Sequence, residues 1–229
     1  MLLWSSFKSY PEIKWEWCYD FIELIQKNKP NEGHTAILKF QEYCQLNDIS
    51  WTLITQNIDN YHSELLQNSD VIKTEITQDG EKGHGFTNGV LEIHGNLFYM
   101  RWFNEWNLDL YSVPPRDTNK SIEDQIPKCT KCGEIMRPHI LWFDESYTSE
   151  FHRLDEVQKA IGSSVDALIV VGTALATTLA FKLVREWLKK DILSIDVNLD
   201  PVWTVGHSVQ VVEKAEKALP NLFKEFIIR

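Results

Sequence analysis

Long hydrophobic runs, cysteines and basic residues are all scarce in this 229-residue chain, and each shortage excludes a class of protein. No uninterrupted apolar run approaches the roughly 20 residues that a membrane-spanning helix needs. Four cysteines are too few for a disulfide framework in a chain this long. A net charge of −10 argues against a direct nucleic-acid binder, which normally carries a basic face. We therefore expect a globular protein of a reducing, intracellular compartment: the cytoplasm, or alternatively the nucleus.

Helix-like and strand-like segments alternate along the chain. Apolar residues recur at helical spacing in four segments: 11–27, 35–45, 148–164 and 215–226. Apolar or β-branched runs typical of strands lie at 49–54, 90–93, 98–102, 140–143, 167–171 and 192–197. A further helix is expected between Gly172 and residue 190, and residues 60–88 and 103–128 are expected to be loops. This alternation predicts an α/β fold with a doubly wound, parallel, Rossmann-like sheet.

The same pattern predicts three regions. Residues 1–48 form a helical N-terminal segment, and residues 49–95 and 137–229 form the Rossmann-like domain. Residues 96–136 form a small, loop-rich domain. In open α/β sheets ligands bind at the carboxyl ends of the strands, so polar residues at those ends are the first candidates for a site.

Two strand ends carry most of these candidates. Gln56, Asn57 and Asp59 follow the apolar run 51–54, and His94 follows the run 90–93. A histidine at a strand end can act as a general base near neutral pH. Amide side chains both donate and accept, which suits ribose hydroxyls. The structural alternative is a histidine bonded to a backbone carbonyl, with Asn57 and Asp59 capping local backbone groups.

Seven segments of the chain resemble, in order, segments of the sirtuins, the NAD-dependent protein-lysine deacylases. They read KPN at 29–31 with His34, TQNID at 55–59, EIHG at 92–95, CTKCG at 129–133, RPHILWFDE at 137–145, DALIVVGTA at 166–174 and VNLD at 197–200. The resemblance implies that His94, with Asn57 and Asp59, is catalytic. In sirtuins the matching histidine deprotonates a ribose hydroxyl after the acyl oxygen has attacked the anomeric carbon of NAD. The resemblance further implies contacts with NAD by Gln56, Asn57, Asp59, Gly172, Thr173, Ala174 and Asn198.

The resemblance also implies a substrate site for an acylated-lysine protein or peptide. An extended peptide would add as a strand to the edge formed by Ile140, Leu141, Phe143, Asp144 and Glu145. Asp144 replaces the usual glycine of the family. We therefore expect its bulk and charge to narrow the mouth of the acyl-lysine tunnel or to favour a cationic peptide.

Cys129 and Cys132 resemble one half of the sirtuin zinc ribbon. The family places a second cysteine pair soon after the HG segment, where this chain has none. Two thiolates alone bind zinc poorly. We expect Trp102, Phe103 and Trp106 to replace the metal by apolar packing, although a zinc ion remains the alternative.

The chain departs from the family in one more respect. Sirtuins begin with a strand and a Gly-rich loop that holds the pyrophosphate, whereas Gly33 is the only glycine here before residue 80. We therefore expect the first strand and that loop to be missing. Three functions stay open: an NAD-dependent lysine deacylase releasing nicotinamide and O-acyl-ADP-ribose, a sirtuin-fold ADP-ribosyltransferase or NAD hydrolase, and an inactive module that binds acyl-lysine or a partner. The oligomeric state is not predicted.

Overall fold

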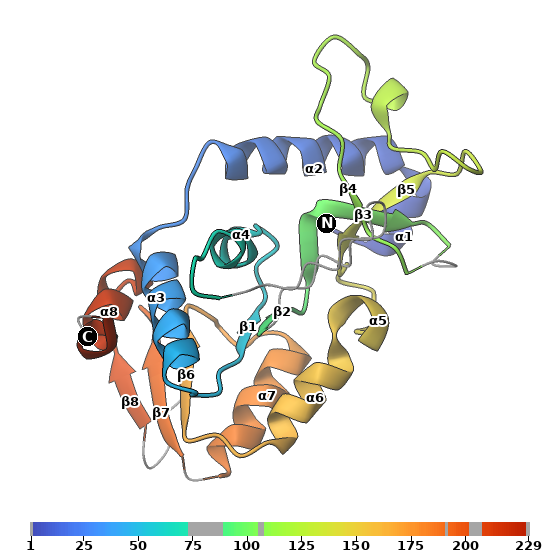
Figure 1. Cartoon of the computed structure of the whole chain (residues 1–229). Coiled ribbons are helices and arrows are strands. Elements are labelled where there is room, and N and C mark those ends of the chain that lie inside the picture. Colours follow the sequence, from blue (N-terminus) through green and yellow to red (C-terminus); the bar gives the residue numbers. More distant parts are fainter. Residues whose placement is uncertain (1, 73–88, 105–107, 191, 202–207, 228–229) are drawn as a thin grey trace. The chain divides into compact units, whose positions relative to one another are not determined.

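The computed structural model of the chain describes residues 2–72, 89–104, 108–190, 192–201 and 208–227 (Figure 1). The chain forms two compact units, described in turn below. The first unit comprises Met1–Lys29 and Trp51–Glu156, and the second comprises Pro30–Ser50 and Val157–Arg229. The predicted division into residues 1–48, 49–95 with 137–229, and 96–136 stays a prediction.

The first unit contains two small sheets. Strand β1 (Leu53–Thr55) runs parallel to β2 (Val90–Glu92). In the second sheet β3 (Gly95–Trp102) lies between β4 (Tyr111–Ser112) and β5 (Met136–Ile140), antiparallel to both. Its helices are α1 (Trp4–Ser9), α2 (Pro11–Gln26), α4 (Tyr61–Gln67) and α5 (Ser149–His152), and α6 (Leu154–Gly162) begins in it.

Helix α2 organises the core of the first unit. It begins with Pro11, whose fixed φ suits the first turn of a helix. One of its faces is buried against Phe7, Leu97, Ile140 and Trp142, through Trp15, Cys18, Tyr19, Ile22 and Ile25. The indole nitrogen of Trp15 donates to the backbone carbonyl of Met136 over 3.0 Å. The helix therefore holds β5 by apolar burial and by one buried hydrogen bond.

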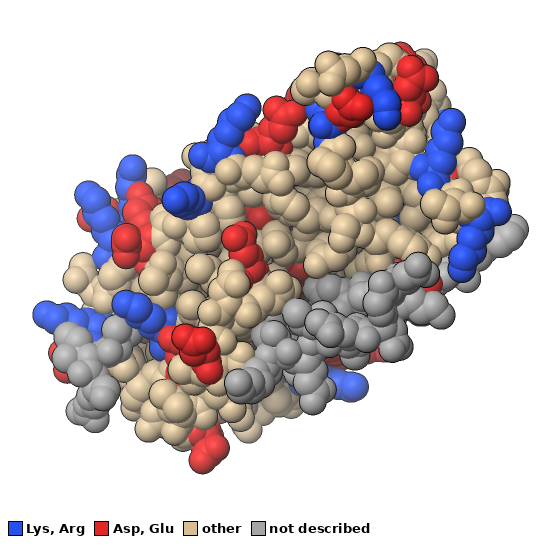
Figure 2. All heavy atoms as spheres, turned by 45° about the horizontal axis from the view of Figure 1, so that its top comes forward, with Lys and Arg blue, Asp and Glu red and all other residues tan. Residues whose placement is uncertain are grey.

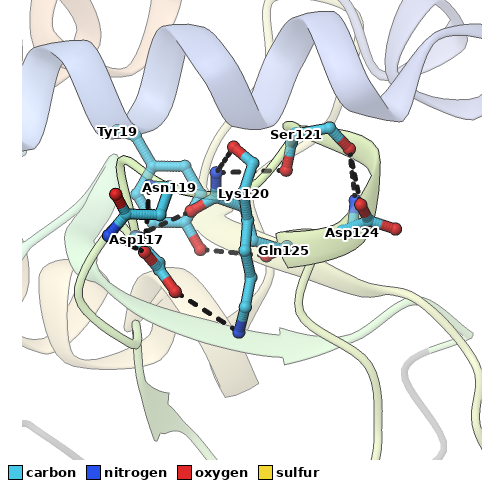
Figure 3. Close-up of polar contacts among 7 residues, drawn as sticks. All are labelled: Tyr19, Asp117, Asn119, Lys120, Ser121, Asp124 and Gln125. Atoms are coloured by element: carbon cyan, nitrogen blue, oxygen red, sulfur yellow. Dashed lines mark hydrogen bonds and ion pairs between the residues drawn. The ribbon is translucent and has the colours of Figure 1, made fainter.

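Residues 117–125, part of the predicted loop-rich insert at 103–128, are ordered by side chains that bond to nearby backbone groups (Figure 3). The Tyr19 hydroxyl donates to the Gln125 carbonyl over 3.2 Å, and the Asp117 N–H donates to the Gln125 side-chain oxygen over 2.9 Å. Asp117 in turn accepts from the N–H of Asn119 over 3.0 Å. These bonds lie around the short 3-10 helix η1 (Glu123–Gln125). They give backbone N–H and carbonyl groups the hydrogen-bond partners that they would have in a sheet.

The second unit contains a parallel three-stranded sheet in the order β6 (Ala167–Val171), β7 (Leu193–Val197) and β8 (Ser208–Val211). Its helices are α3 (Glu32–Leu46), α7 (Thr178–Leu188), α8 (Ala215–Leu222) and α9 (Lys224–Ile227). Helix α3 starts at a capping box, in which the Asn31 side chain accepts from the N–H groups of Gly33 and His34. The KPN segment with His34 therefore has a structural role as a helix start.

Parallel pairing of β1 with β2, and of β6, β7 and β8, agrees with the predicted α/β class. Four short elements were not predicted: α1, β8, and, in the insert expected to be a loop, β4 and η1. Residues 60–88 were predicted as a loop, and this was wrong at α4; residues 73–88 lie outside the described part of the chain. None of the helices in the described residues is long and apolar enough to span a bilayer.

Several predicted elements have different bounds, and the helix expected at 215–226 is two helices, α8 and α9. The helix expected at 148–164 is two helices, α5 and α6, because Arg153 between them adopts a left-handed conformation with φ 53°. The prediction of a strand at 140–143 was wrong, because β5 ends at Ile140 and shares only that residue with the expected range. A turn follows it, closed by a bond from the Glu145 N–H to the Trp142 carbonyl over 3.0 Å.

Charged side chains of both signs are interspersed over the face drawn in Figure 2. Lys and Arg lie among Asp and Glu there. The acidic excess of the sequence therefore does not by itself identify a cationic partner.

Candidate functional site

His94 is held at the turn between β2 and β3 by two hydrogen bonds. Its Nδ1 lies 3.0 Å from the backbone carbonyl oxygen of Gln56, and its Nε2 lies 2.8 Å from the hydroxyl of Tyr147. A carbonyl oxygen only accepts, so the neutral ring carries its hydrogen on Nδ1. Nε2 is then the acceptor, and the Tyr147 hydroxyl donates to it. The contact with a backbone carbonyl, expected as the structural alternative, thus also prepares Nε2 as a base.

Burial favours the neutral form of His94. Desolvation lowers the pKa of this imidazole, and the bond to the Gln56 carbonyl, which raises the pKa, offsets only part of the effect. An imidazole with a lowered pKa is unprotonated at neutral pH. His94 can therefore accept a proton there, as the first step of a general base requires.

Gly95 lets the backbone approach closely beside His94. Its φ is +79°, and a Cβ atom at this position would meet the carbonyl oxygen of His139 at 2.2 Å. The neighbouring backbone N–H of Leu141 donates to the His94 carbonyl over 2.9 Å. Only glycine fits this position, because a side chain would push β3 and β5 apart. The close pairing of the two strands fixes the backbone that carries the base.

The residues after β1 form a compact turn. Asn57 is exposed, and its backbone N–H donates to the Thr55 hydroxyl over 3.0 Å. Asp59 accepts from the N–H of Tyr61 over 3.1 Å. These are the local caps that a purely structural role would give. The structure brings the Gln56 backbone to His94, while contacts of Gln56, Asn57 and Asp59 with NAD stay predictions.

A buried carboxyl group lies two residues before His94. Glu92 accepts from the Ser63 hydroxyl over 2.9 Å and from the Asn96 amide over 3.1 and 3.2 Å. Desolvation raises its pKa from the usual 4.5 to about 7, against the lowering effect of these hydrogen bonds. Sequence patterns alone did not single out this group as special.

We expect Glu92→Gln to remove a pH dependence of stability. Between pH 4.5 and 7 folded Glu92 holds a proton that the unfolded chain releases, so the free energy of unfolding falls as pH rises through this window. A shift of this size corresponds to about 3 kcal/mol. Urea unfolding should show that the free energy of unfolding of the variant, relative to that of the parent, is larger at pH 8 than at pH 4 by about that amount. Glu64→Gln, an exposed change on α4, serves as control, and an equal pH response in parent and Glu92 variant would contradict the prediction.

The predicted substrate segment is a turn beyond Ile140. Phe143 is 78% exposed, and its backbone N–H donates to the Leu2 carbonyl over 3.0 Å. The Asp144 carboxylate accepts from the N–H groups of Trp4 and Ser5, which caps α1. Desolvation opposes ionisation of Asp144, but these bonds outweigh it and lower the pKa of the carboxyl group. The expected strand-like edge is therefore corrected to a turn after Ile140, and the contacts of Leu141 and its neighbours with a peptide stay predictions.

Glu145 holds this turn together. Its carboxylate forms a bidentate pair with Arg137 at 2.6 and 2.7 Å and also accepts from the Trp142 N–H over 3.1 Å. The Arg137 side chain is 1% exposed, and its guanidinium lies 3.9 Å from the ring centre of Trp4. The paired charges thus link β5, the turn and α1.

The remaining predicted NAD residues lie together in the second unit, at the carboxyl ends of β6 and β7. The Asn198 amide donates to the Thr173 carbonyl over 2.9 Å, and the Gly172 N–H donates to the Val197 carbonyl over 3.0 Å. Gly172 has a φ of +58°, and apart from its chain neighbours no atom of the described residues lies within 4 Å of the position that a Cβ would occupy. Ala174 is exposed beside it. Open space beside a strand-end glycine and polar groups suits a nucleotide.

The described residues offer no complete metal site. Cys129 and Cys132 lie in a short turn, and no group of three or more His, Cys, Asp or Glu side chains that could hold an ion occurs in the described part of the chain. Two thiolates do not fit a structural zinc site. Phe103 packs on Trp4 with ring centres 5.0 Å apart, whereas Trp106 lies outside the described residues. Zinc binding and its replacement by aromatic packing both stay predictions.

Tyr147 is the residue of this site that the sequence did not reveal. It lies 53 positions from His94, and no local pattern of residues links the two. Their contact depends on the antiparallel pairing of β3 with β5, in which Gly95 stands opposite Ile140. Only a signal that reports this register would have identified Tyr147.

Comparisons with known proteins agree with the resemblance. A family model described as the Sir2 family matches residues 3–178. An NAD-dependent protein deacylase of Mycobacterium tuberculosis is 29% identical over 234 residues, covering 97% of this chain and 86% of that protein. One of Pyrococcus abyssi is 28% identical over 170 residues, covering 74% of this chain and 57% of that protein. The chain thus spans little more than half the length of the archaeal relative.

Solved structures show the same fold. A crystal structure of a Sir2 homologue in complex with NAD superposes with a TM-score of 0.74 at 23% identity, covering 97% of this chain and 74% of that chain. A Sir2 structure with a bound acetylated peptide superposes with a TM-score of 0.72 at 22% identity, covering 100% of this chain and 84% of that chain. These neighbours confirm the predicted Rossmann-like architecture.

Proposed function

Because the chain belongs to the Sir2 family, we propose that it is an NAD-dependent protein-lysine deacylase that releases nicotinamide and O-acyl-ADP-ribose. The observation that carries this proposal is the state of His94. Its ring is half-buried and oriented by the Gln56 carbonyl, and desolvation lowers its pKa, so Nε2 is a base at neutral pH. An inactive binding module would not require a base prepared in this way.

The residues present fit NAD as the co-substrate. Gly172, Thr173 and Asn198 lie at strand ends where a nucleotide binds in this type of fold, with open space beside Gly172. NAD supplies an electrophilic anomeric carbon with nicotinamide as the leaving group. His94 accepts the ribose hydroxyl proton, and its pKa, lowered by burial, keeps it able to do so at neutral pH.

The substrate is an acylated lysine in a protein or peptide. The support is the family, together with a solved Sir2 structure bound to an acetylated peptide. The exposed Phe143 and the turn after Ile140 are the proposed contacts.

Incubation of the chain with NAD and an acetyl-lysine peptide tests the proposal. We expect mass spectrometry to show deacetylated peptide, nicotinamide and O-acetyl-ADP-ribose in equal amounts. Omission of NAD is the control and should abolish all three products. Free ADP-ribose or an ADP-ribosylated protein would instead indicate a hydrolase or a transferase. No turnover by a chain shown to be folded would favour the inactive binding module.

A further inference from the structure

The hydroxyl of Tyr147 occupies the one nitrogen of His94 that can act as a base. A substrate hydroxyl can therefore reach this base either by displacing Tyr147 or through it. We propose that Tyr147 is a further catalytic residue, which accepts the proton of the substrate hydroxyl and passes its own proton to Nε2 of His94. This inference rests on the proposed function, because that reaction supplies the hydroxyl.

The direction of the hydrogen bonds supports such a relay. The Gln56 carbonyl can only accept, so Nδ1 of His94 donates to it and Nε2 must accept. The Tyr147 hydroxyl then donates its single hydrogen to Nε2 over 2.8 Å, and a hydroxyl oxygen with two lone pairs can accept while it donates. In this series of hydrogen bonds Tyr147 thus donates to His94, and His94 donates to the Gln56 carbonyl.

Proton transfer along this chain is balanced. The O–H bond of the substrate breaks as a new O–H bond forms on Tyr147. The original O–H bond of Tyr147 breaks as an N–H bond forms on Nε2 of His94. The products are the substrate alkoxide and an imidazolium, and Tyr147 remains neutral throughout.

The groups behind Tyr147 do not compete for this proton. The Tyr147 ring meets the ring of His152 edge-on, with centres 6.2 Å apart, and His152 stacks with His139 at 6.4 Å. Burial, with the nearby charge of Arg101, lowers the pKa of His152 to about 3, and burial also holds the pKa of His139 well below its usual value. Both rings are therefore neutral at physiological pH. Of the three histidines gathered here, His94 alone has the Tyr147 hydroxyl on its Nε2.

Kinetics of Tyr147→Phe test the relay. We expect kcat for deacetylation to fall on the order of 10²-fold while the KM values for NAD and peptide stay unchanged. When chemistry limits the rate, the solvent deuterium isotope effect should also fall, because one proton moves instead of two. Tyr19→Phe is the matched control, since it removes a hydroxyl that donates to the Gln125 carbonyl and should leave kcat unchanged. Full activity of Tyr147→Phe, or a lower KM at unchanged kcat, would overturn the relay.

Nitrogen-15 NMR of the histidine rings separates this inference from the proposed function. In Tyr147→Phe the Nε2 resonance of His94 should move while Nδ1 stays unchanged, because only the Nε2 bond is lost. The resonances are assigned by their absence from the spectrum of His94→Ala. An unmoved Nε2 resonance would overturn the relay whatever the activity. If the resonance moves in Tyr147→Phe but the parent protein shows no turnover, the proposed function is overturned, and the relay with it.

Discussion

Replacement of His94 by alanine is expected to lower the rate of deacetylation by about 10²- to 10⁴-fold, the usual contribution of a positioned general base. The variant removes Nε2, the acceptor on which the Tyr147 hydroxyl lies. It does not remove the Gln56 carbonyl or the strand pairing beside Gly95. Steady-state kinetics with NAD and an acetyl-lysine peptide measure the loss, which should fall on kcat.

A control variant and a binding measurement separate loss of the base from loss of folding or of NAD binding. His62→Ala, a partly buried histidine on α4, should retain the parental rate. Calorimetry should show that His94→Ala still binds NAD, since the polar strand ends of the second unit are unchanged. Parental turnover by a folded His94→Ala protein would remove this residue from the mechanism.

Replacement of Glu145 by alanine should destabilise the fold by about 3–5 kcal/mol, because it leaves a buried arginine without its bidentate partner. Arg137 is 1% exposed, so water cannot replace the lost carboxylate without a rearrangement of the turn. The Trp142 N–H would lose its acceptor as well. Urea unfolding at neutral pH measures the difference.

A matched pair of variants separates the charge effect from general damage. Glu150→Ala, on the exposed side of α5, should change the free energy of unfolding by no more than about 0.5 kcal/mol. Arg137→Met combined with Glu145→Leu should recover much of the loss, since an apolar pair can replace a buried ion pair. Equal stability of Glu145→Ala and the parent would show that the pair does not hold the turn.

Much of the site could be predicted because local patterns mark strand ends. The apolar runs before Gln56 and His94 stop where β1 and β2 stop, to within two residues. The run at 167–171 coincides with β6. Where a strand has a strongly apolar sequence with polar residues directly after it, burial decides both its position and its end.

Other features depend on contacts between distant residues. The break at Arg153 gave no sequence signal, because a left-handed conformation is rare for residues other than glycine. Its guanidinium donates to the Val90 carbonyl over 2.7 Å, a partner 63 positions away. The turn after β5 is likewise held by the ion pair of Arg137 with Glu145. Periodicity does not report such pairings.

The close approach at Gly95 limits how the activity of this chain could be redesigned. A laboratory selection for a new acyl preference would naturally randomise the positions around His94. At position 95 every side chain would meet the carbonyl oxygen of His139 at 2.2 Å, so such a library would recover glycine alone. On the turn after β5 the position that can be varied is Phe143, whose side chain is 78% exposed, whereas Asp144 and Glu145 hold the turn. The base and the position that can be varied therefore belong to different segments of the chain, the turn between β2 and β3 and the turn after β5.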